Sequence, residues 1–156
     1  MNDPRILETT WPDEAATQQF AQTLAQRLRA QGLDGCIFLS GDLGAGKTTW
    51  VRHLLHALGV HGRIKSPTYA VVEPYHVSAG DLWHFDFYRF SDPQEWEDAG
   101  FRDLFASPGL KLCEWPDRVQ ALLPRPDLEV HLVALDDTRR QVRLSAHTAR
   151  GQAWRA

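Results

Sequence analysis

The 156-residue sequence has only two cysteines, no long apolar run and no marked excess of charge. Cys36 and Cys113 each fall inside an apolar run, and their spacing fits neither a zinc site nor a redox pair. We therefore expect both to be small core residues in a reducing cytosol. Because no run approaches the ~20 apolar residues of a membrane span and the N-terminus has no signal-peptide pattern, we expect a cytoplasmic protein without membrane contact.

The formal net charge of -3 gives no overall attraction to nucleic acid or to a membrane, although it is compatible with a local basic patch. Repeats and low-complexity tracts are also absent. At this length we expect one domain over residues 1–156, which can bury about two thirds of the surface of the unfolded chain. A core of that size needs no disulfide or metal to stabilise it.

The sequence does contain a phosphate-binding signature. A short apolar run at residues 36–39 leads into residues 41–48, which match G-x-x-x-x-G-K-[ST] at each fixed position, and apolar residues then recur at helical spacing. Glycine lets the backbone of such a loop come close to a triphosphate with its amide hydrogens pointing inward. This context of strand, loop and helix favours a nucleotide site over a chance glycine-rich turn. The predicted ATP-binding residues are Gly41, Asp42, Leu43, Gly44, Ala45, Gly46, Lys47, Thr48 and Thr49.

Two side chains of this loop have predicted chemical roles. Lys47 supplies a mobile cation for the outer phosphates. Thr48 lies where the helix N-terminus adds the positive end of its dipole, and its hydroxyl can hold a Mg²⁺ ion that bridges the phosphates. No Asn/Thr-Lys-x-Asp element for reading guanine follows, which leaves adenine as the expected base. The chain also has little room for the lid and base-binding insertion of a nucleoside kinase.

Two later apolar runs each carry a carboxylate near their ends. Asp86 lies in a strand-like run over residues 81–88, and Glu114 ends another over residues 109–114. Because open α/β sheets bind ligands at the carboxyl ends of their strands, we expect both acids to gather beside the phosphate loop. Asp86 or Glu114 then positions the attacking water, and Glu114 can also bind the metal. Strict alternation places His84 on the same face as Asp86, where a functional and a structural role are equally open.

These elements predict a P-loop NTPase-like α/β fold, a three-layer sandwich with a mixed, largely parallel central sheet. Residues 71–77 and 81–88 suggest a hairpin. A second strand pair is expected around a solvated turn near the end of the chain, over residues 128–135 and 142–147, with Arg139, Arg140 and Arg143 clustered there. Thr10 is the expected cap of the first helix. We expect residues 149–156 to be loose.

Three further segments each allow two interpretations. Trp11 either stacks on a base near the nucleotide or packs against the first helix. Thr68, in the turn over residues 66–69, is either a switch hydroxyl that reaches the metal or part of an ordinary proline turn. The acidic segment around Trp96 is either a solvated face or a surface for a partner.

Taken together, these motifs resemble the bacterial TsaE family, formerly called YjeE. The likeness covers roughly residues 10–130, and the segment H-x-D-x-Y-R after S-P-T-[YF] is far more specific than the phosphate loop alone. The segments that carry it are Gly41 to Thr49, Lys65-Ser66-Pro67-Thr68-Tyr69, Val72-Glu73-Pro74-Tyr75, His84-Phe85-Asp86-Phe87-Tyr88-Arg89, Asp92-Pro93, Gly100-Phe101-Arg102-Asp103 and Glu114-Trp115-Pro116.

The resemblance implies an ATPase that takes part in the threonylcarbamoylation of adenosine 37 in tRNAs reading ANN codons. It implies TsaB and TsaD as partner proteins, with tRNA engaged indirectly through the complex and ATP hydrolysis resetting that complex between turnovers. By the same resemblance, Thr48 and Glu114 bind Mg²⁺, Asp86 is needed for activity and Trp115 lies beside the nucleotide. Composition and spacing by themselves indicate only a magnesium-dependent nucleotide site with two auxiliary carboxylates.

The leading hypothesis is therefore a slow Mg²⁺-dependent ATPase subunit in which Lys47, Asp86 and Glu114 act in catalysis. One alternative is a nucleotide-gated binding module in which hydrolysis is incidental. Another is a small-molecule kinase whose acceptor pocket is lined by residues 66–69 and 84–89.

Overall fold

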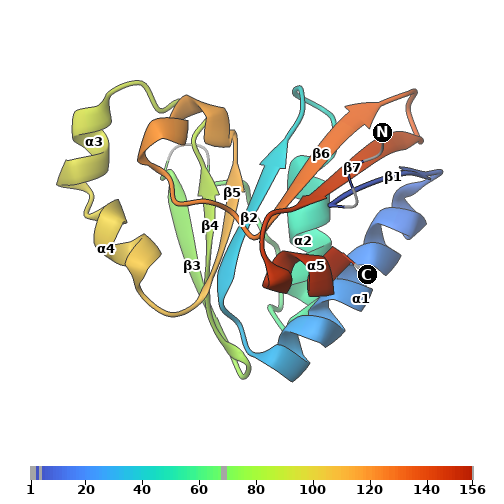
Figure 1. The fold of residues 1–156 in the computed structure, drawn as a ribbon, viewed down its shortest axis with the longest axis horizontal. Coiled ribbons are helices and arrows are strands. Elements are labelled where there is room, and N and C mark those ends of the chain that lie inside the picture. Colours follow the sequence, from blue (N-terminus) through green and yellow to red (C-terminus); the bar gives the residue numbers. More distant parts are fainter. Residues whose placement is uncertain (1–2, 4, 68–69, 156) are drawn as a thin grey trace.

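A computed structural model describes residues 3, 5–67 and 70–155 of the chain. Its strands form a sheet in the order β1-β7-β6-β2-β5-β4-β3 (Figure 1). The strands are β1 (Ile6–Trp11), β2 (Gly35–Ser40), β3 (Val72–Val77), β4 (Gly80–Asp86), β5 (Leu110–Glu114), β6 (Leu128–Ala134) and β7 (Arg140–Ala146). The helices are α1 (Glu14–Gln31), α2 (Lys47–Ala57), α3 (Pro93–Asp98), α4 (Phe101–Ala106) and α5 (Ala149–Arg155), with short 3-10 turns at Pro116–Arg118 and Gln120–Leu122.

The centre of the sheet is parallel and its outer strands are antiparallel. β2 pairs in parallel with β5 and with β6, and β4 pairs in parallel with β5. β3 pairs antiparallel with β4, and β7 pairs antiparallel with β6 and β1, so both predicted strand pairs are present. The carboxyl ends of β2, β4, β5 and β6 therefore meet at one edge of the sheet, where ligands bind in open α/β folds.

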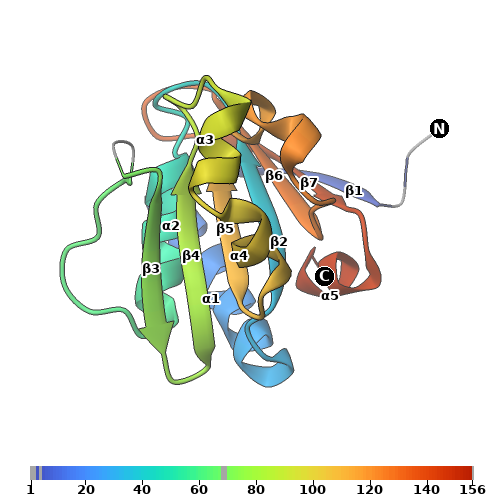
Figure 2. The ribbon, with the colours of Figure 1, turned by 90° about the vertical axis from the view of Figure 1, so that its left-hand side faces the viewer.

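Alternating residues of the central strands bury two apolar layers. On one face, Ile37 and Leu39 of β2 pack with residues of α1 and α2. On the other face, Cys36 and Phe38 of β2 belong to a cluster that includes Trp96 of α3. Figures 1 and 2 show α3 and α4 on one side of the sheet and α1 and α2 on the other. The mixed sheet between two helical layers confirms the expected α/β fold.

The first helix begins later than predicted. Thr10 belongs to β1, where its register partner is Gln141 of β7. The cap of α1 is Asp13 instead, whose side chain accepts a hydrogen bond from the Ala16 amide at 2.9 Å. Strand pairing across the sheet thus overrides a local capping signal. α1 ends at Gln31.

Trp96 and the C-terminal residues both contribute to the core. Trp96 is 2% exposed, with its ring centroid 5.4 Å from that of Phe105, so its ring is not available to a partner. The acidic residues on either side of it are exposed, as predicted for a solvated face. The C-terminal residues form α5 rather than a loose tail, because Trp154 is 1% exposed and its carbonyl accepts a hydrogen bond from Arg27 at 2.6 Å. Among the described residues, no helix has the length and apolar character needed to cross a membrane.

Candidate functional site

The phosphate loop joins β2 to α2 through a backbone that depends on glycine. Gly41, Gly44 and Gly46 have φ angles of 139°, 80° and 105°, in the region where residues with a side chain are strained. A Cβ at Gly41 would also collide with the backbone carbonyl of Leu132 in β6. The turn therefore has the conformation that the motif requires, and it places the N-terminus of α2 at the carboxyl edge of the sheet.

Lys47 begins α2 and is buried inside this loop. The residue is 5% exposed, and its Nζ donates hydrogen bonds to the carbonyls of Gly41 and Asp42. The same atom lies 3.9 Å from the ring centroid of Trp115. Burial lowers the pKa of Lys47, while nearby carboxylates, Glu114 first among them, act in the opposite direction. Phosphate oxygens would be stronger partners for this cation than the neutral carbonyls that hold it here.

Glu114 ends β5 with its carboxylate against the first turn of α2. The hydroxyl of Thr48 donates to it, with Oγ1 lying 2.9 Å from Oε1 and 3.1 Å from Oε2. Glu114 is 2% exposed, and its register partner in β2 is Leu39. The pairing of the two strands therefore brings together the two residues predicted to bind metal.

Asp86 ends β4, the next strand along the sheet, where its register partner is Glu114. Its buried carboxylate accepts hydrogen bonds from the Ser66 hydroxyl at 2.9 Å and from the Tyr88 amide at 3.0 Å. Ser66 thereby links the segment before β3 to the carboxyl edge of the sheet. Thr68, the predicted switch hydroxyl, lies outside the described residues.

His84, for which the sequence allows either role, contacts Glu114. Its Nε2 lies 2.6 Å from Oε2 of Glu114, and the side chain is 0% exposed. An ionised carboxylate can only accept hydrogen bonds, so Nε2 is the donor when Glu114 is ionised. His84 and Thr48 therefore hold the same carboxylate from two sides.

A cavity of about 280 Å³ lies between the loop and the two carboxylates. The ring of Trp115 lines it, with its centroid 5.0 Å from that of Tyr88. Gly41 and Asp42 of the predicted ATP-binding loop are not among the residues that line this cavity. The lining residues are Leu43, Gly44, Ala45, Gly46, Lys47, Thr48, Thr49, Ser66, Asp86, Tyr88, Glu114, Trp115 and Arg140.

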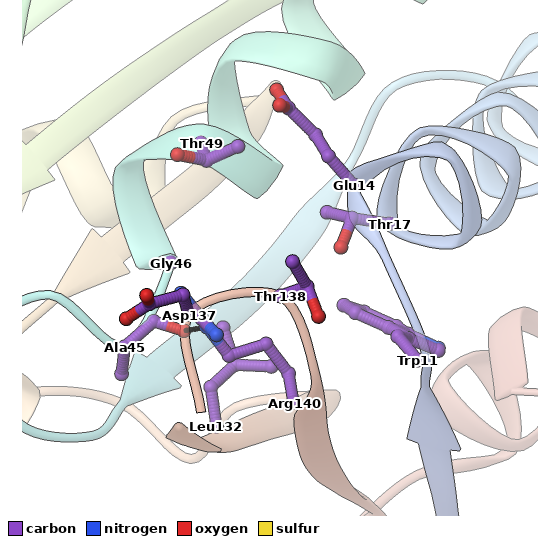
Figure 3. Close-up of a pocket in the computed structure, with 10 residues that line it drawn as sticks. All are labelled: Trp11, Glu14, Thr17, Ala45, Gly46, Thr49, Leu132, Asp137, Thr138 and Arg140. Atoms are coloured by element: carbon purple, nitrogen blue, oxygen red, sulfur yellow. Dashed lines mark hydrogen bonds between the residues drawn. The ribbon is translucent and has the colours of Figure 1, made fainter. Parts of the chain in front are cut away.

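A second cavity, of about 220 Å³, also borders the loop (Figure 3). Trp11 and Thr17 line it from β1 and α1, and Thr138 lines it from the turn between β6 and β7. The ring centroid of Trp11 is 5.3 Å from that of Phe20 in α1. Trp11 thus packs against the first helix, as one of its two interpretations predicted, and it also lines a cavity beside the loop.

Arg140 belongs to the site although the sequence placed it in a solvated hairpin. Its Nε donates a hydrogen bond to the carbonyl of Ala45 at 2.9 Å, and its side chain lines both cavities. Arg139 and Arg143 are exposed and form ion pairs with acidic side chains, as a solvated hairpin would have them. No local pattern distinguishes the three arginines, because the approach of Arg140 to the loop depends on the adjacency of β2 and β6.

The donors at this site suit Mg²⁺. In residues 3, 5–67 and 70–155, no three His, Cys, Asp or Glu side chains gather into a self-contained metal site. Mg²⁺ does not need one, because it usually binds one or two protein oxygens and completes its octahedron with water and phosphate oxygens. The Thr48 hydroxyl and the Glu114 carboxylate supply such a pair.

Comparison with known proteins places this geometry in a family. The family model described as threonylcarbamoyl adenosine biosynthesis protein TsaE matches residues 11–142. The chain belongs to the TsaE family. Its sequence is 40% identical over 143 residues to the tRNA threonylcarbamoyladenosine biosynthesis protein TsaE of Haemophilus influenzae, a match that covers 90% of each chain.

More distant comparisons agree. The TsaE protein of Bacillus subtilis is 34% identical over 108 residues, covering 69% of this chain and 67% of the relative. The crystal structure of YdiB from Bacillus subtilis superposes with a TM-score of 0.78 at 24% identity, covering 99% of this chain and 94% of the other, and shows the same fold.

The TsaE match includes Arg140 as well as the loop, both carboxylates and Trp115, whereas α5 lies beyond its end. The contacts of α5 are structural. Its Gly151 lies directly against the backbone of Asp127, and Trp154 lies in the core beside α1. The part of the chain that matches TsaE therefore contains the residues described at the candidate site.

Proposed function

We propose that this TsaE family member binds and hydrolyses ATP with Mg²⁺, in the cytoplasm, as a subunit required for the threonylcarbamoylation of adenosine 37 in tRNAs reading ANN codons. We further propose that it acts in complex with TsaB and TsaD and meets tRNA through that complex. The family match supports the pathway. The observation that best supports Mg²⁺-dependent ATP hydrolysis is the hydrogen bond between the Thr48 hydroxyl and the Glu114 carboxylate, at 2.9 Å, at the end of a glycine-dependent loop.

The residues of the 280 Å³ cavity have separate tasks in this proposal. The loop amides and Lys47 bind the phosphates, and Lys47 exchanges its carbonyl partners for phosphate oxygens. Thr48 and Glu114 hold Mg²⁺, which when bound neutralises charge that develops on the phosphates. We assign the attacking water to Asp86, because Glu114 already faces Thr48 whereas Asp86 is oriented by Ser66 and the Tyr88 amide.

The 220 Å³ cavity is a candidate for the adenosine end of the nucleotide. It shares Ala45, Gly46, Thr49 and Arg140 with the phosphate site, so a single ligand can extend from one cavity into the other. Trp11 would offer a ring for stacking on a base, and Arg140 lines both cavities.

His84 could not line the acceptor pocket of a small-molecule kinase, because the residue is 0% exposed and contacts Glu114. Ser66, Asp86 and Tyr88 do line the cavity, so a kinase is left to experiment. A nucleotide-gated binding module remains the alternative to an ATPase, since both would use the same loop.

Phosphate release from ATP, measured with and without TsaB and TsaD, tests the proposal. We expect slow Mg²⁺-dependent release by the protein alone and faster release in the complex. Complex formation that needs ATP but brings no increase in phosphate release would favour the binding module. Labelled phosphate appearing on a metabolite rather than in water would establish a kinase.

A further inference from the structure

We propose that His84 is a positioning residue that fixes the orientation of the Glu114 carboxylate for Mg²⁺. The inference rests on the proposed function, because Glu114 must bind the metal for its orientation to matter. Its starting point is the 2.6 Å contact between Nε2 of His84 and Oε2 of Glu114, in a part of the sheet where both side chains are at most 3% exposed.

The sheet register gives His84 this position. His84 pairs with Leu112 in β5, two residues before Glu114 and on the same face. Its ring therefore lies deeper in the sheet than the carboxylate and approaches it from behind, while Thr48 approaches from α2. Hydrogen bonds from two different elements, β4 and α2, leave the carboxylate little freedom to turn.

With the residues that the structure describes, the ring of His84 makes a single hydrogen bond, to Glu114. Within the part of the chain that the structure describes, Nδ1 of His84 is buried without a hydrogen-bond partner. A buried polar atom without a partner costs about 1–3 kcal/mol, so an apolar side chain would be the cheaper choice if packing were the only task here. Unlike an apolar side chain, a histidine at this position can form the hydrogen bond with Glu114.

The chemistry favours a donor behind the metal ligand. Groups that hydrogen-bond to ligating side chains fix their rotamer, and their loss typically weakens metal binding about 10–100-fold. Thr48 Oγ1 lies 2.9 Å from Oε1 and 3.1 Å from Oε2, whereas His84 contacts Oε2, so His84 fixes Oε2 and leaves Oε1 with Thr48. Without His84, the carboxylate can rotate about its last torsion and lose that direction.

Two substitutions with similar chemistry separate positioning from packing. The amide of His84→Gln can place its nitrogen where Nε2 lies, whereas the amide of His84→Asn is one methylene shorter and falls short of Glu114. Both leave part of a buried amide unpaired, so a general folding cost affects both. His76→Asn is the matched control, because His76 also contacts a carboxylate, Asp81 at 2.7 Å, but is exposed on the β3–β4 hairpin.

The measurements are the Mg²⁺ dependence of ATP hydrolysis and calorimetric binding of ADP with and without Mg²⁺. For His84→Asn we expect the Mg²⁺ concentration at half-maximal rate to rise about 10-fold or more, with Mg²⁺-free ADP binding little changed. His84→Gln should recover most of this loss, and His76→Asn should behave as the wild type. Equal losses in both His84 variants, or an unchanged Mg²⁺ dependence in His84→Asn, would overturn the inference.

A measurement on the wild type keeps the inference testable if His84→Asn does not fold. In a ¹⁵N-edited NMR spectrum of the histidine rings, adding Mg²⁺ to the ADP-bound protein should shift the Nε2 signal of His84 and leave that of His76 in place. An unmoved His84 signal would overturn the positioning role. Wild-type protein that hydrolyses ATP equally well without Mg²⁺ would instead overturn the proposed function, and this inference with it.

Discussion

Replacing Glu114 with glutamine tests the metal site most directly, because the change preserves shape and removes charge. An amide has one acceptor oxygen and one donor nitrogen in place of two acceptors. If its oxygen stays on His84, its nitrogen faces Thr48, whose hydroxyl can rotate and accept. Hydrogen bonding in the nucleotide-free protein is thereby conserved, and we expect the free energy of unfolding to change by no more than about 1 kcal/mol.

The same rearrangement removes a metal ligand. The amide nitrogen would then occupy the place of Oε1, the carboxylate oxygen 2.9 Å from the Thr48 hydroxyl, and it cannot bind Mg²⁺. Substitutions behind a metal ligand cost about 10–100-fold in affinity, and Glu114 is proposed as the ligand itself. We therefore expect Mg²⁺ affinity to fall about 100-fold, or about 2.7 kcal/mol.

The assay follows ADP binding by calorimetry with and without Mg²⁺, together with the Mg²⁺ dependence of hydrolysis. Glu114→Gln should bind ADP normally without Mg²⁺ and lose the added affinity that Mg²⁺ brings. Glu73→Gln, an exposed change on β3, is the control. A variant that keeps the wild-type Mg²⁺ requirement would remove Glu114 from the metal site and refute the reasoning given above.

Three other changes test the remaining contacts. Lys47→Met should lower ATP affinity about 10–100-fold, because it removes charged hydrogen bonds worth about 1.5–3 kcal/mol. Chemical denaturation should show an intact fold. Full activity in this variant would exclude Lys47 from phosphate binding. Arg140→Gln should weaken nucleotide binding about 10-fold in calorimetry, whereas Arg139→Gln should not. Equal effects of the two substitutions would show that Arg140 has no special role in nucleotide binding. Trp154→Ala should cost about 3–5 kcal/mol of unfolding free energy in denaturant titrations without changing ATP affinity; unchanged stability would mean that α5 is not part of the core.

The sequence predicted best what short stretches determine. The apolar run before Gly41 and the glycine spacing specify β2 and the loop, because the conformation there is determined by residues close together in the sequence. Asp86 and Glu114 were predicted to gather at one edge through a general rule about parallel strands. The structure places both in the lining of one cavity.

What the sequence did not predict depends on distant partners. α5 has seven residues, too few for a stable isolated helix, and it forms because Trp154 enters a core built from other elements. Arg140 reaches Ala45 only after β6 and β7 have paired beside β2. Thr10 loses its capping role to strand pairing with β7. No local pattern encodes these contacts.

The geometry of the site follows from the packing of the two apolar layers. Leu110 and Leu112 of β5 pack on the side of α1 and α2, and Cys113 packs on the opposite side. A slip of β5 by one residue would exchange these faces, burying Glu114 in the wrong layer, and a slip by two would move it by about 6.6 Å along the sheet. Either shift would break the contacts of Glu114 with Thr48 and His84. The register that buries the leucines is therefore the one that holds the carboxylate at the loop, so stability and the proposed metal site depend on the same strand pairing.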